Sequence, residues 1–513
     1  MQDPEKAAAL PLPRRKRAPF WQFWDKRTFR FNLKSFLPGA NFSIRRFSIV
    51  EAAFLFILAL LASRGLGVIR QIIFNAYFGT GPEADAYYAA ARLPDTLYNL
   101  VAGGALTHAF IPVFLSYEKQ QGEYEAWRLA SLVLNVLLVL MTLLVLLAEV
   151  LAPAFVSNIL VPGYTPTQKE LTTSLTRILL LQPLILGLST VATAVLSSKR
   201  QFLLPAFAIA VYNFGIIGGL LVTMAMPAIG IYGPTVGVLI ACVLQVLVQI
   251  PGLRKQKARY LFSWNLRHPG LLETARLLIP NALAIGVAYV ALIVDTLFTS
   301  FLPQSSLSVL HNAEMLQALP VALIGQAIGQ SLLPHLSLHA SMGRYVRMRQ
   351  TALKIMGASI MLTVPALIAL IVLGQLLIRL LFQHGAFDQH SADMTYLALI
   401  GYALAIPGMS AASLLSSGFF ALKDALTPFL ANTFGLALRT GLIVLFLDVF
   451  KDRGPLVILS IPLALAGAIT AESILQWLLL LWQLRRRLKL DRSLLRLQRW
   501  REYRQSLAEH SRR

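Results

Sequence analysis

Twelve apolar segments run through this 513-residue chain, and each is long enough to cross the ~30 Å hydrocarbon core of a bilayer. They span residues 49–77, 84–115, 127–156, 171–197, 204–226, 231–252, 271–301, 307–338, 351–382, 392–421, 427–449 and 455–484. Charged residues make up only 14% of the chain, whereas a soluble protein carries roughly a quarter. We therefore predict an all-α polytopic membrane protein with about twelve transmembrane helices.

The connections between these segments alternate in their Lys and Arg content. Basic clusters fall at Lys119 and Arg128, Lys199 and Arg200, 254–268, 344–349 and Lys423. The intervening connections are poorer in Lys and Arg, with KDRGP (451–455) as the exception. Because cytoplasmic loops are enriched in Lys and Arg, the basic connections and both termini are predicted to be cytoplasmic.

The formal net charge of +22 is concentrated at the two ends of the sequence. Residues 1–47 hold 11 Lys and Arg against 3 Asp and Glu, and residues 485–513 hold the same numbers, so each end carries +8. Basic tails that adjoin membrane spans favour anionic lipids as partners, and we predict no nucleic-acid partner. The single cysteine, Cys242, excludes a disulfide framework or a cysteine metal cluster.

The two halves of the apolar region resemble each other. Residues 90–114 align with residues 312–336 at a constant offset of 222, which matches Gly103 with Gly325. A parallel repeat of this kind predicts two six-helix lobes around a central cavity. The predicted organisation is a basic, aromatic cytoplasmic segment (1–47), an N-lobe of helices 1–6 (48–253), a basic cytoplasmic loop (254–270), a C-lobe of helices 7–12 (271–484) and a basic cytoplasmic tail (485–513).

Charged residues inside the second span give the strongest functional signal. Asp85, Tyr88, Arg92, Asp95 and Asn99 recur at helical spacing and form one polar stripe. A charge at the centre of a spanning helix costs about 2.5–3.5 kcal/mol on insertion scales, so such residues face a bundle interior or a watery cavity. The stripe is predicted to line something polar inside the membrane. An internal ion-pair network that only orients helices is the alternative.

Five longer motifs stand out in the sequence: SRGLGVIRQIIFNAYFG (63–79), EADAYYAAARLPD (83–95), YGPTVGVLIACVLQVLVQIPGLRK (232–255), RLLFQHGAF (379–387) and FFALKDALTP (419–428). They resemble motifs of the MurJ (MviN) lipid II flippases, a family of the multidrug/oligosaccharidyl-lipid/polysaccharide exporter superfamily. The resemblance implies two six-helix bundles around a cationic cavity in the bacterial plasma (inner) membrane. It also implies a function in peptidoglycan biosynthesis, the movement of the undecaprenyl-pyrophosphate-linked precursor, lipid II, from the inner to the outer leaflet.

The resemblance also suggests which residues bind the substrate. Arg64 and Arg70 match two cavity arginines of the family, and Asp85 matches its first-loop aspartate. Together with Arg92 of the polar stripe, they are the candidate substrate-binding residues. Arginine suits a pyrophosphate because its guanidinium stays ionised and binds phosphate oxygens bidentately. For Arg70, a side chain that extends to the headgroups is the alternative.

Asp295 resembles the aspartate of a cation site in some family members, and Asn432 is a second candidate ligand. Na⁺ or H⁺ bound at Asp295 is the expected coupling ion. No other metal and no cofactor is expected. A buried acid paired with a neighbouring helix is the alternative for Asp295.

The sequence also departs from the family pattern. Tyr98 and Met315 stand where family members often carry arginine. Glu314 occupies the repeat position of Arg92, so the two residues are candidates for a gate that pairs opposite charges across the cavity. No apolar span follows residue 484, whereas two further helices are common in the family.

The sequence contains no catalytic or nucleotide-binding motif, so a transporter is predicted and not an enzyme. A lipid II flippase driven by an ion gradient or the membrane potential is the main hypothesis, with cell-wall synthesis enzymes as further partners. A flippase for another polyprenyl-linked oligosaccharide is one alternative. The other is a non-transporting membrane scaffold.

Overall fold

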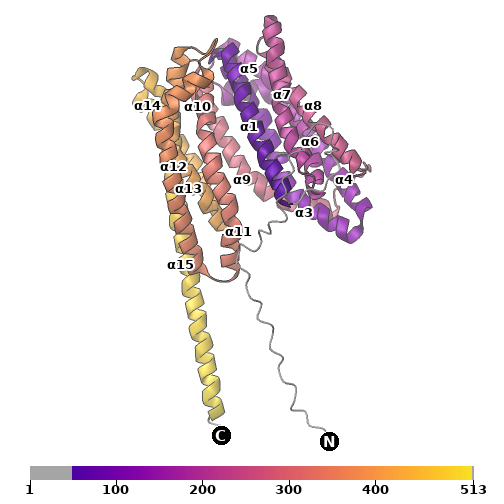
Figure 1. The fold of residues 1–513 in the computed structure, drawn as a ribbon, viewed down its shortest axis with the longest axis vertical. Helices are drawn as coiled ribbons and strands as arrows, with labels where there is room; N and C mark the ends of the chain where they lie inside the picture. Colours follow the sequence, from indigo (N-terminus) through magenta and orange to yellow (C-terminus); the bar gives the residue numbers. More distant parts are fainter. Residues whose placement is uncertain (1–48, 511–513) are drawn as a thin grey trace. The chain divides into compact units, whose positions relative to one another are not determined.

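The computed structural model describes residues 49–510, and every regular element within this range is a helix (Figure 1). The predicted segment 1–47 lies outside the described residues, as do residues 48 and 511–513. The helices of the first half are α1 (Ile49–Phe78), α2 (Pro82–Val101), α3 (Gly104–Gln121), α4 (Glu123–Phe155), η3 (Val156–Leu160), α5 (Pro166–Leu179), α6 (Gln182–Ser198), α7 (Leu203–Ala225), η4 (Pro227–Ile229) and α8 (Tyr232–Lys255). Those of the second half are α9 (Pro269–Thr299), α10 (Ser306–Pro320), η5 (Val321–Gln326), α11 (Ala327–Ser341), α12 (Tyr345–Phe382), α13 (Gln389–Ala421), α14 (Leu426–Phe450), η6 (Gly454–Leu459) and α15 (Ser460–His510).

These helices account for the predicted spans. Eleven helical stretches within the described residues are long and apolar enough to cross a membrane. Together with α1, they follow the twelve predicted segments in order, which confirms an all-helical membrane fold. Some of the predicted spans are divided into more than one helical element, namely α2 with α3, α5 with α6, α10 with η5 and α11, and η6 with α15.

The order of helices repeats at a nearly constant interval. Tyr345, the first residue of α12, follows Glu123, the first residue of α4, by 222 residues. Leu426 of α14 follows Leu203 of α7 by 223 residues. The offset found in the sequence therefore extends to whole helices.

The interruption of the second span has a counterpart in the repeat. A β-carbon on Gly103, between α2 and α3, would lie 2.9 Å from Cα of Asn99. At the equivalent position in η5, a β-carbon on Gly325 would lie 3.0 Å from Oγ of Ser410. Small residues let transmembrane helices approach closely, so both glycines allow a neighbouring backbone or side chain to fill the space at the break.

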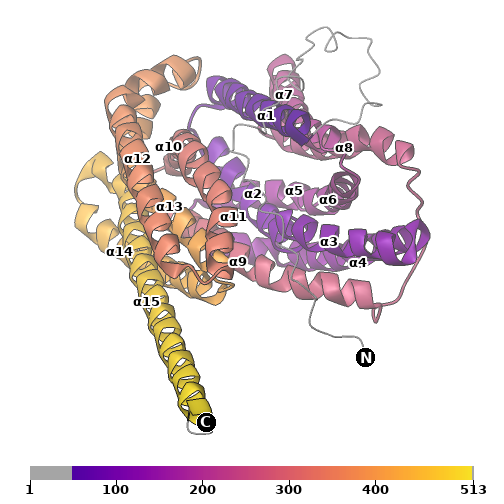
Figure 2. The same ribbon diagram turned by 60° about the horizontal axis from the view of Figure 1, so that its bottom comes forward.

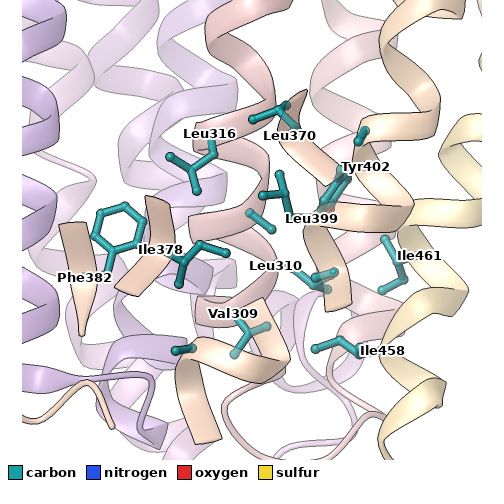
Figure 3. Packing of buried hydrophobic residues seen from close by; sticks show 14 of the residues in the cluster. Val309, Leu310, Leu316, Leu370, Ile378, Phe382, Leu399, Tyr402, Ile458 and Ile461 are labelled. Carbon is teal, nitrogen blue, oxygen red and sulfur yellow. The ribbon is translucent and has the colours of Figure 1, made fainter. Parts of the chain in front are cut away.

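The second half of the chain encloses its own apolar core, in which side chains from α10, α12, α13 and α15 interlock (Figure 3). Leu310, Phe382, Leu399 and Ile461 are among its fully or almost fully buried members. A separate core joins α1, α2, α5, α7 and α8. Each half thus packs as a bundle in which van der Waals contact dominates, as expected for helices in lipid.

The helix α9 contacts helices of both bundles. It packs more extensively against α2 and α3 than against α14 (Figure 2). Its C-terminal part nevertheless reaches α14, because Asp295 pairs there with Arg439. Although α9 is the first helix of the second repeat, most of its partners belong to the first.

The last helix, α15, is 51 residues long and continues past the other helices (Figure 1). The basic stretch predicted as a tail from residue 485 is, as far as His510, a direct extension of the final span. At about 1.5 Å per residue, this extension makes the last helix much longer than a membrane span requires.

Candidate functional site

Three buried amide side chains link the two bundles. Gln71 and Asn75 of α1 both donate hydrogen bonds of 2.9 Å to the side-chain oxygen of Asn312 in α10. The same Gln71 nitrogen lies 3.0 Å from Oδ1 of Asn75 and 2.6 Å from the Tyr88 hydroxyl, so its two hydrogens are shared among three acceptors. The spacing of Gln71 and Asn75, four residues apart, places both on one face of α1. These amides were not among the predicted site residues, although polar side chains at helical spacing inside an apolar span could have indicated them.

Asp85, predicted to bind substrate, is buried and faces the other bundle. Its two carboxylate oxygens accept hydrogen bonds from the backbone N–H groups of Ser305, at 2.9 Å, and Ser308, at 2.7 Å. Ser305 is the residue just before α10 and Ser308 lies in its first turn, where N–H groups lack partners within the helix. Asp85 of α2 therefore caps a helix of the opposite bundle. Substrate binding by Asp85 stays a prediction, since its oxygens are used in this contact here.

The connections predicted to lie on the outer side also meet. The hydroxyls of Thr80 and Ser391 lie 2.7 Å apart, and the Ser308 hydroxyl donates to the Thr80 carbonyl at 2.9 Å. The backbone N–H of Ala386 donates to the carbonyl of Ala76 at 2.8 Å. We refer to these contacts of residues 71–85 with residues 305–312 and 386–391 as the inter-lobe seal. It closes the two bundles against each other at one end.

Asp388 supports the seal from the second bundle. Its carboxylate accepts a hydrogen bond of 2.8 Å from the backbone N–H of Ser391, at the start of α13. The pKa of Asp388 lies below its usual range because the backbone N–H and the hydroxyl of Ser391 both stabilise the carboxylate. The cap fixes the turn that presents Ser391 to Thr80.

Part of the polar stripe lines a cavity of about 140 Å³ beneath the seal. Arg70, Asp95, Gln182 and His311 are among the side chains that surround it. Arg70 donates to the side chain of Asn213 at 3.3 Å, and Asp95 accepts from Gln182 at 2.9 Å. Arg70 therefore points into the first bundle in this conformation. Asp95 and Arg70 face the same cavity without forming an ion pair with each other.

Arg64 lies nearly two turns before Arg70 on α1, at about 3.6 residues per turn, and Arg64 is exposed. The side chain of Asn213, which accepts from Arg70, also donates to the carbonyl of Ser63 at 3.3 Å. Asn213 therefore contacts α1 both at Arg70 and at the residue before Arg64. The exposure of Arg64 leaves its guanidinium available to a ligand.

The predicted gate residues do not pair in this conformation. Arg92 donates from Nε to the Thr296 hydroxyl of α9 at 3.2 Å. Among the ion pairs of the described residues, none joins Arg92 to Glu314. The gate stays a prediction for another state of the cycle.

The two candidate cation ligands face different partners. The carboxylate of Asp295 forms an ion pair and hydrogen bond with the guanidinium of Arg439 in α14. Asn432, two turns earlier on α14, faces α15. In one amide orientation its oxygen accepts from Gln476 at 3.4 Å, and in the opposite orientation its nitrogen donates to Glu472 at 2.7 Å. Arg439 and Glu472 were both missed in the sequence analysis. Among the side chains that the structure describes, no three His, Cys, Asp or Glu residues gather as a metal-binding group.

A second polar cluster lies at the end predicted to be cytoplasmic. The Lys199 ammonium pairs with the carboxylates of Glu118 and Glu123, the latter at 3.0 Å. Burial lowers the pKa of Lys199, but the hydrogen bonds and charges of the two glutamates outweigh it and raise the pKa above its usual value. These partners all belong to the first bundle, so the cluster fixes its loops to one another.

Known proteins resemble this chain over most of its length. A family model described as "Lipid II flippase MurJ" matches residues 74–510. The lipid II flippase MurJ of Burkholderia cenocepacia is 31% identical over 376 residues, which cover 72% of each chain. The probable lipid II flippase MurJ of Thermotoga maritima is 30% identical over 398 residues, covering 78% of this chain and 80% of that relative.

Solved structures agree with the sequence comparison. A structure described as lipid II flippase MurJ in an inward closed conformation superimposes with a TM-score of 0.71 at 26% identity, covering 82% of this chain and 86% of the other. An inward-facing multidrug resistance MATE family transporter of the MOP superfamily gives a TM-score of 0.70 at 14% identity, covering 85% and 99%. The second likeness concerns the fold alone. Because the family model matches residues 74–510 and the helix order and two bundles agree with it, this chain belongs to the MurJ lipid II flippase family.

Proposed function

We propose that this protein moves lipid II from the inner to the outer leaflet of the bacterial plasma membrane by alternating access. Membership of the flippase family supports the substrate. The repeated bundles supply the two bodies that such a cycle requires. In this proposal the protein is a transporter with both termini in the cytoplasm.

The inter-lobe seal is the observation that carries the proposed cycle. It joins the bundles by hydrogen bonds at the end where the predicted outer connections lie. Hydrogen bonds between membrane helices contribute about 0.6 kcal/mol each on average. A seal of this size is strong enough to favour one state and weak enough to open, as a two-state carrier requires.

The cations Arg64, Arg70 and Arg92 are proposed to bind the pyrophosphate. A lipid-linked pyrophosphate carries dense negative charge, and guanidinium groups remain ionised and match its oxygens bidentately. The three side chains come from α1 and α2, whose other residues form the seal. Substrate binding and opening of the seal would then act on the same two helices.

The cycle is proposed to draw on an ion gradient or on the membrane potential, with H⁺ or Na⁺ as the ion. Asp295 is the carboxylate to test first, and its pairing with Arg439 decides which ion it can accept. We propose anionic lipids as partners of the basic segments, including the α15 extension, and cell-wall synthesis enzymes as further partners.

A rescue experiment tests the proposed function. A strain depleted of its essential lipid II flippase is complemented with this chain, and lipid II in the outer leaflet is measured. Growth together with lipid II export is expected. Correct localisation without rescue, and without any effect of Arg64→Ala on other phenotypes, would instead support the scaffold hypothesis.

One observation favours the second candidate, a flippase for another polyprenyl-linked oligosaccharide. Tyr98, which stands at a position often arginine in the family, lies with its hydroxyl 3.0 Å from that of Thr190 in α6. The cavity thus has fewer cations than the resemblance predicts. This activity would be identified if the chain exported a different lipid-linked sugar and did not restore lipid II export in the depleted strain.

A further inference from the structure

The pair formed by Asp295 and Arg439 is enclosed and isolated from other strong partners. The side chains of Arg439 and Asp295 are 12% and 11% exposed. One guanidinium nitrogen binds Oδ2 of the carboxylate, whereas Oδ1 of Asp295 and Nε of Arg439 are buried without a hydrogen-bond partner. A buried carboxylate is tolerated when a cation compensates it. In this chain the compensating cation is a side chain.

The residues around Asp295 do not fit a bound Na⁺. Hard cations need several oxygen ligands at once. The carboxylate of Asp295 is shared with a guanidinium, which has no oxygen to offer. Asn432, the other candidate ligand, interacts with Gln476 and Glu472 of α15. The oxygen set that the family resemblance implies is therefore not assembled around Asp295.

The carboxylate of Asp295 also needs no further cation to compensate its charge. Besides Arg439, Arg92 lies beside this position, since its Nε donates to the hydroxyl of the next residue, Thr296, at 3.2 Å. The carboxylate of Asp295 therefore already has positive charges near it. A Na⁺ beside Asp295 would lie close to the Arg439 guanidinium, and like charges repel strongly where water is excluded.

We infer that Arg439 is the resident cation of Asp295 and takes the place of Na⁺ at this position. Asp295 would then take up no Na⁺, and a coupling role for Asp295 would have to involve H⁺. As a statement about coupling, this inference rests on the proposed transport function, but the pairing itself can be tested without transport. Arg439 acts through Asp295 and is a positioning residue that determines ion specificity.

The test compares the thermal unfolding of purified protein in NaCl and in KCl at equal ionic strength. A ligand that binds only the folded state raises the melting temperature in a saturable manner. Wild-type protein and Arg439→Lys, which keeps the charge, are expected to melt at the same temperature in both salts. Arg439→Ala leaves the buried carboxylate uncompensated, and the space vacated by the guanidinium admits water as the further oxygen ligands. This variant is therefore expected to gain a saturable, Na⁺-specific rise. The double variant Arg439→Ala/Asp295→Asn is expected to lose that rise.

Arg379→Ala is the matched control, since it removes an arginine from an exposed ion pair with Asp393, 3.5 Å long. It should show no Na⁺-specific rise. The inference is overturned if wild-type protein shows a saturable Na⁺ response that Asp295→Asn abolishes, or if folded Arg439→Ala shows none. Should Arg439→Ala not fold, the wild-type comparison decides alone. Because no lipid II is present, a failed rescue in cells would leave this result unaffected.

Discussion

The carboxylate of Asp85 in α2 accepts a hydrogen bond of 2.7 Å from the backbone N–H of Ser308 in α10, 223 residues away. A side chain of one bundle thereby completes the first turn of a helix in the other. Such a cap stabilises the helix only while the bundles touch. It therefore couples the folding of one helix end to the closed state of the inter-lobe seal.

Asp85→Asn is expected to weaken the seal, because an amide offers one acceptor oxygen and no charge to the start of α10. Loss of a cap costs about 0.5–2 kcal/mol, and a charge at a helix N-terminus contributes about 0.3–1 kcal/mol. For a total loss of about 1–2 kcal/mol within these ranges, the closed-to-open ratio should fall roughly 5- to 30-fold. Spin-label distances across the seal measure this shift. A distance distribution like that of wild type would show that Asp85 does not hold the bundles together.

A disulfide between Thr80→Cys and Ser391→Cys should lock the seal. The two hydroxyl oxygens lie 2.7 Å apart, so replacement sulfurs can bond with little backbone movement. In a Cys242→Ala background, oxidation is expected to abolish rescue of a flippase-depleted strain, and reduction to restore it. Each single cysteine serves as the control and should stay active after oxidation. Full activity of the cross-linked protein would show that the seal need not open.

Arg64→Ala is expected to abolish flipping while membrane levels stay normal, because the exposed guanidinium makes no contact on which the described fold relies. Arg64→Lys should recover only part of the activity, since a point charge replaces a bidentate fork. Both variants are compared by rescue at matched protein levels. Rescue by Arg64→Ala equal to wild type would remove Arg64 from the substrate site.

The Arg92–Glu314 gate predicts charge-swap recovery. Arg92→Glu and Glu314→Arg should each lose function, because each leaves two like charges facing each other in a poorly screened space. The double swap should regain function if the pair forms in another state of the cycle. The double-mutant cycle is read by rescue. In this conformation Arg92 contacts Thr296, so Thr296→Val is the control that tests this contact alone. Purely additive defects would show that the gate does not form.

Several properties followed from the sequence because they depend on local composition. Apolar length and the Lys and Arg pattern predicted the spans, and the offset of 222 predicted the repeated order of helices, which holds from α4 and α12 onward. The same pattern placed the connections that contain Thr80 and Ser391 on one side, and the structure brings them together. Hydropathy and loop charge act residue by residue, so they can be read without knowing the partners.

Partners across the fold were decided only by the tertiary structure. Asp85 caps α10 instead of standing free in a cavity, and Asp295 pairs with Arg439, 144 residues further along the chain. A sequence shows that a buried acid needs a compensating positive charge. It does not show which of several arginines supplies that charge. Which one does so depends on how α9 lies against α14 and α2, and that packing is set by side-chain shape over the whole bundle.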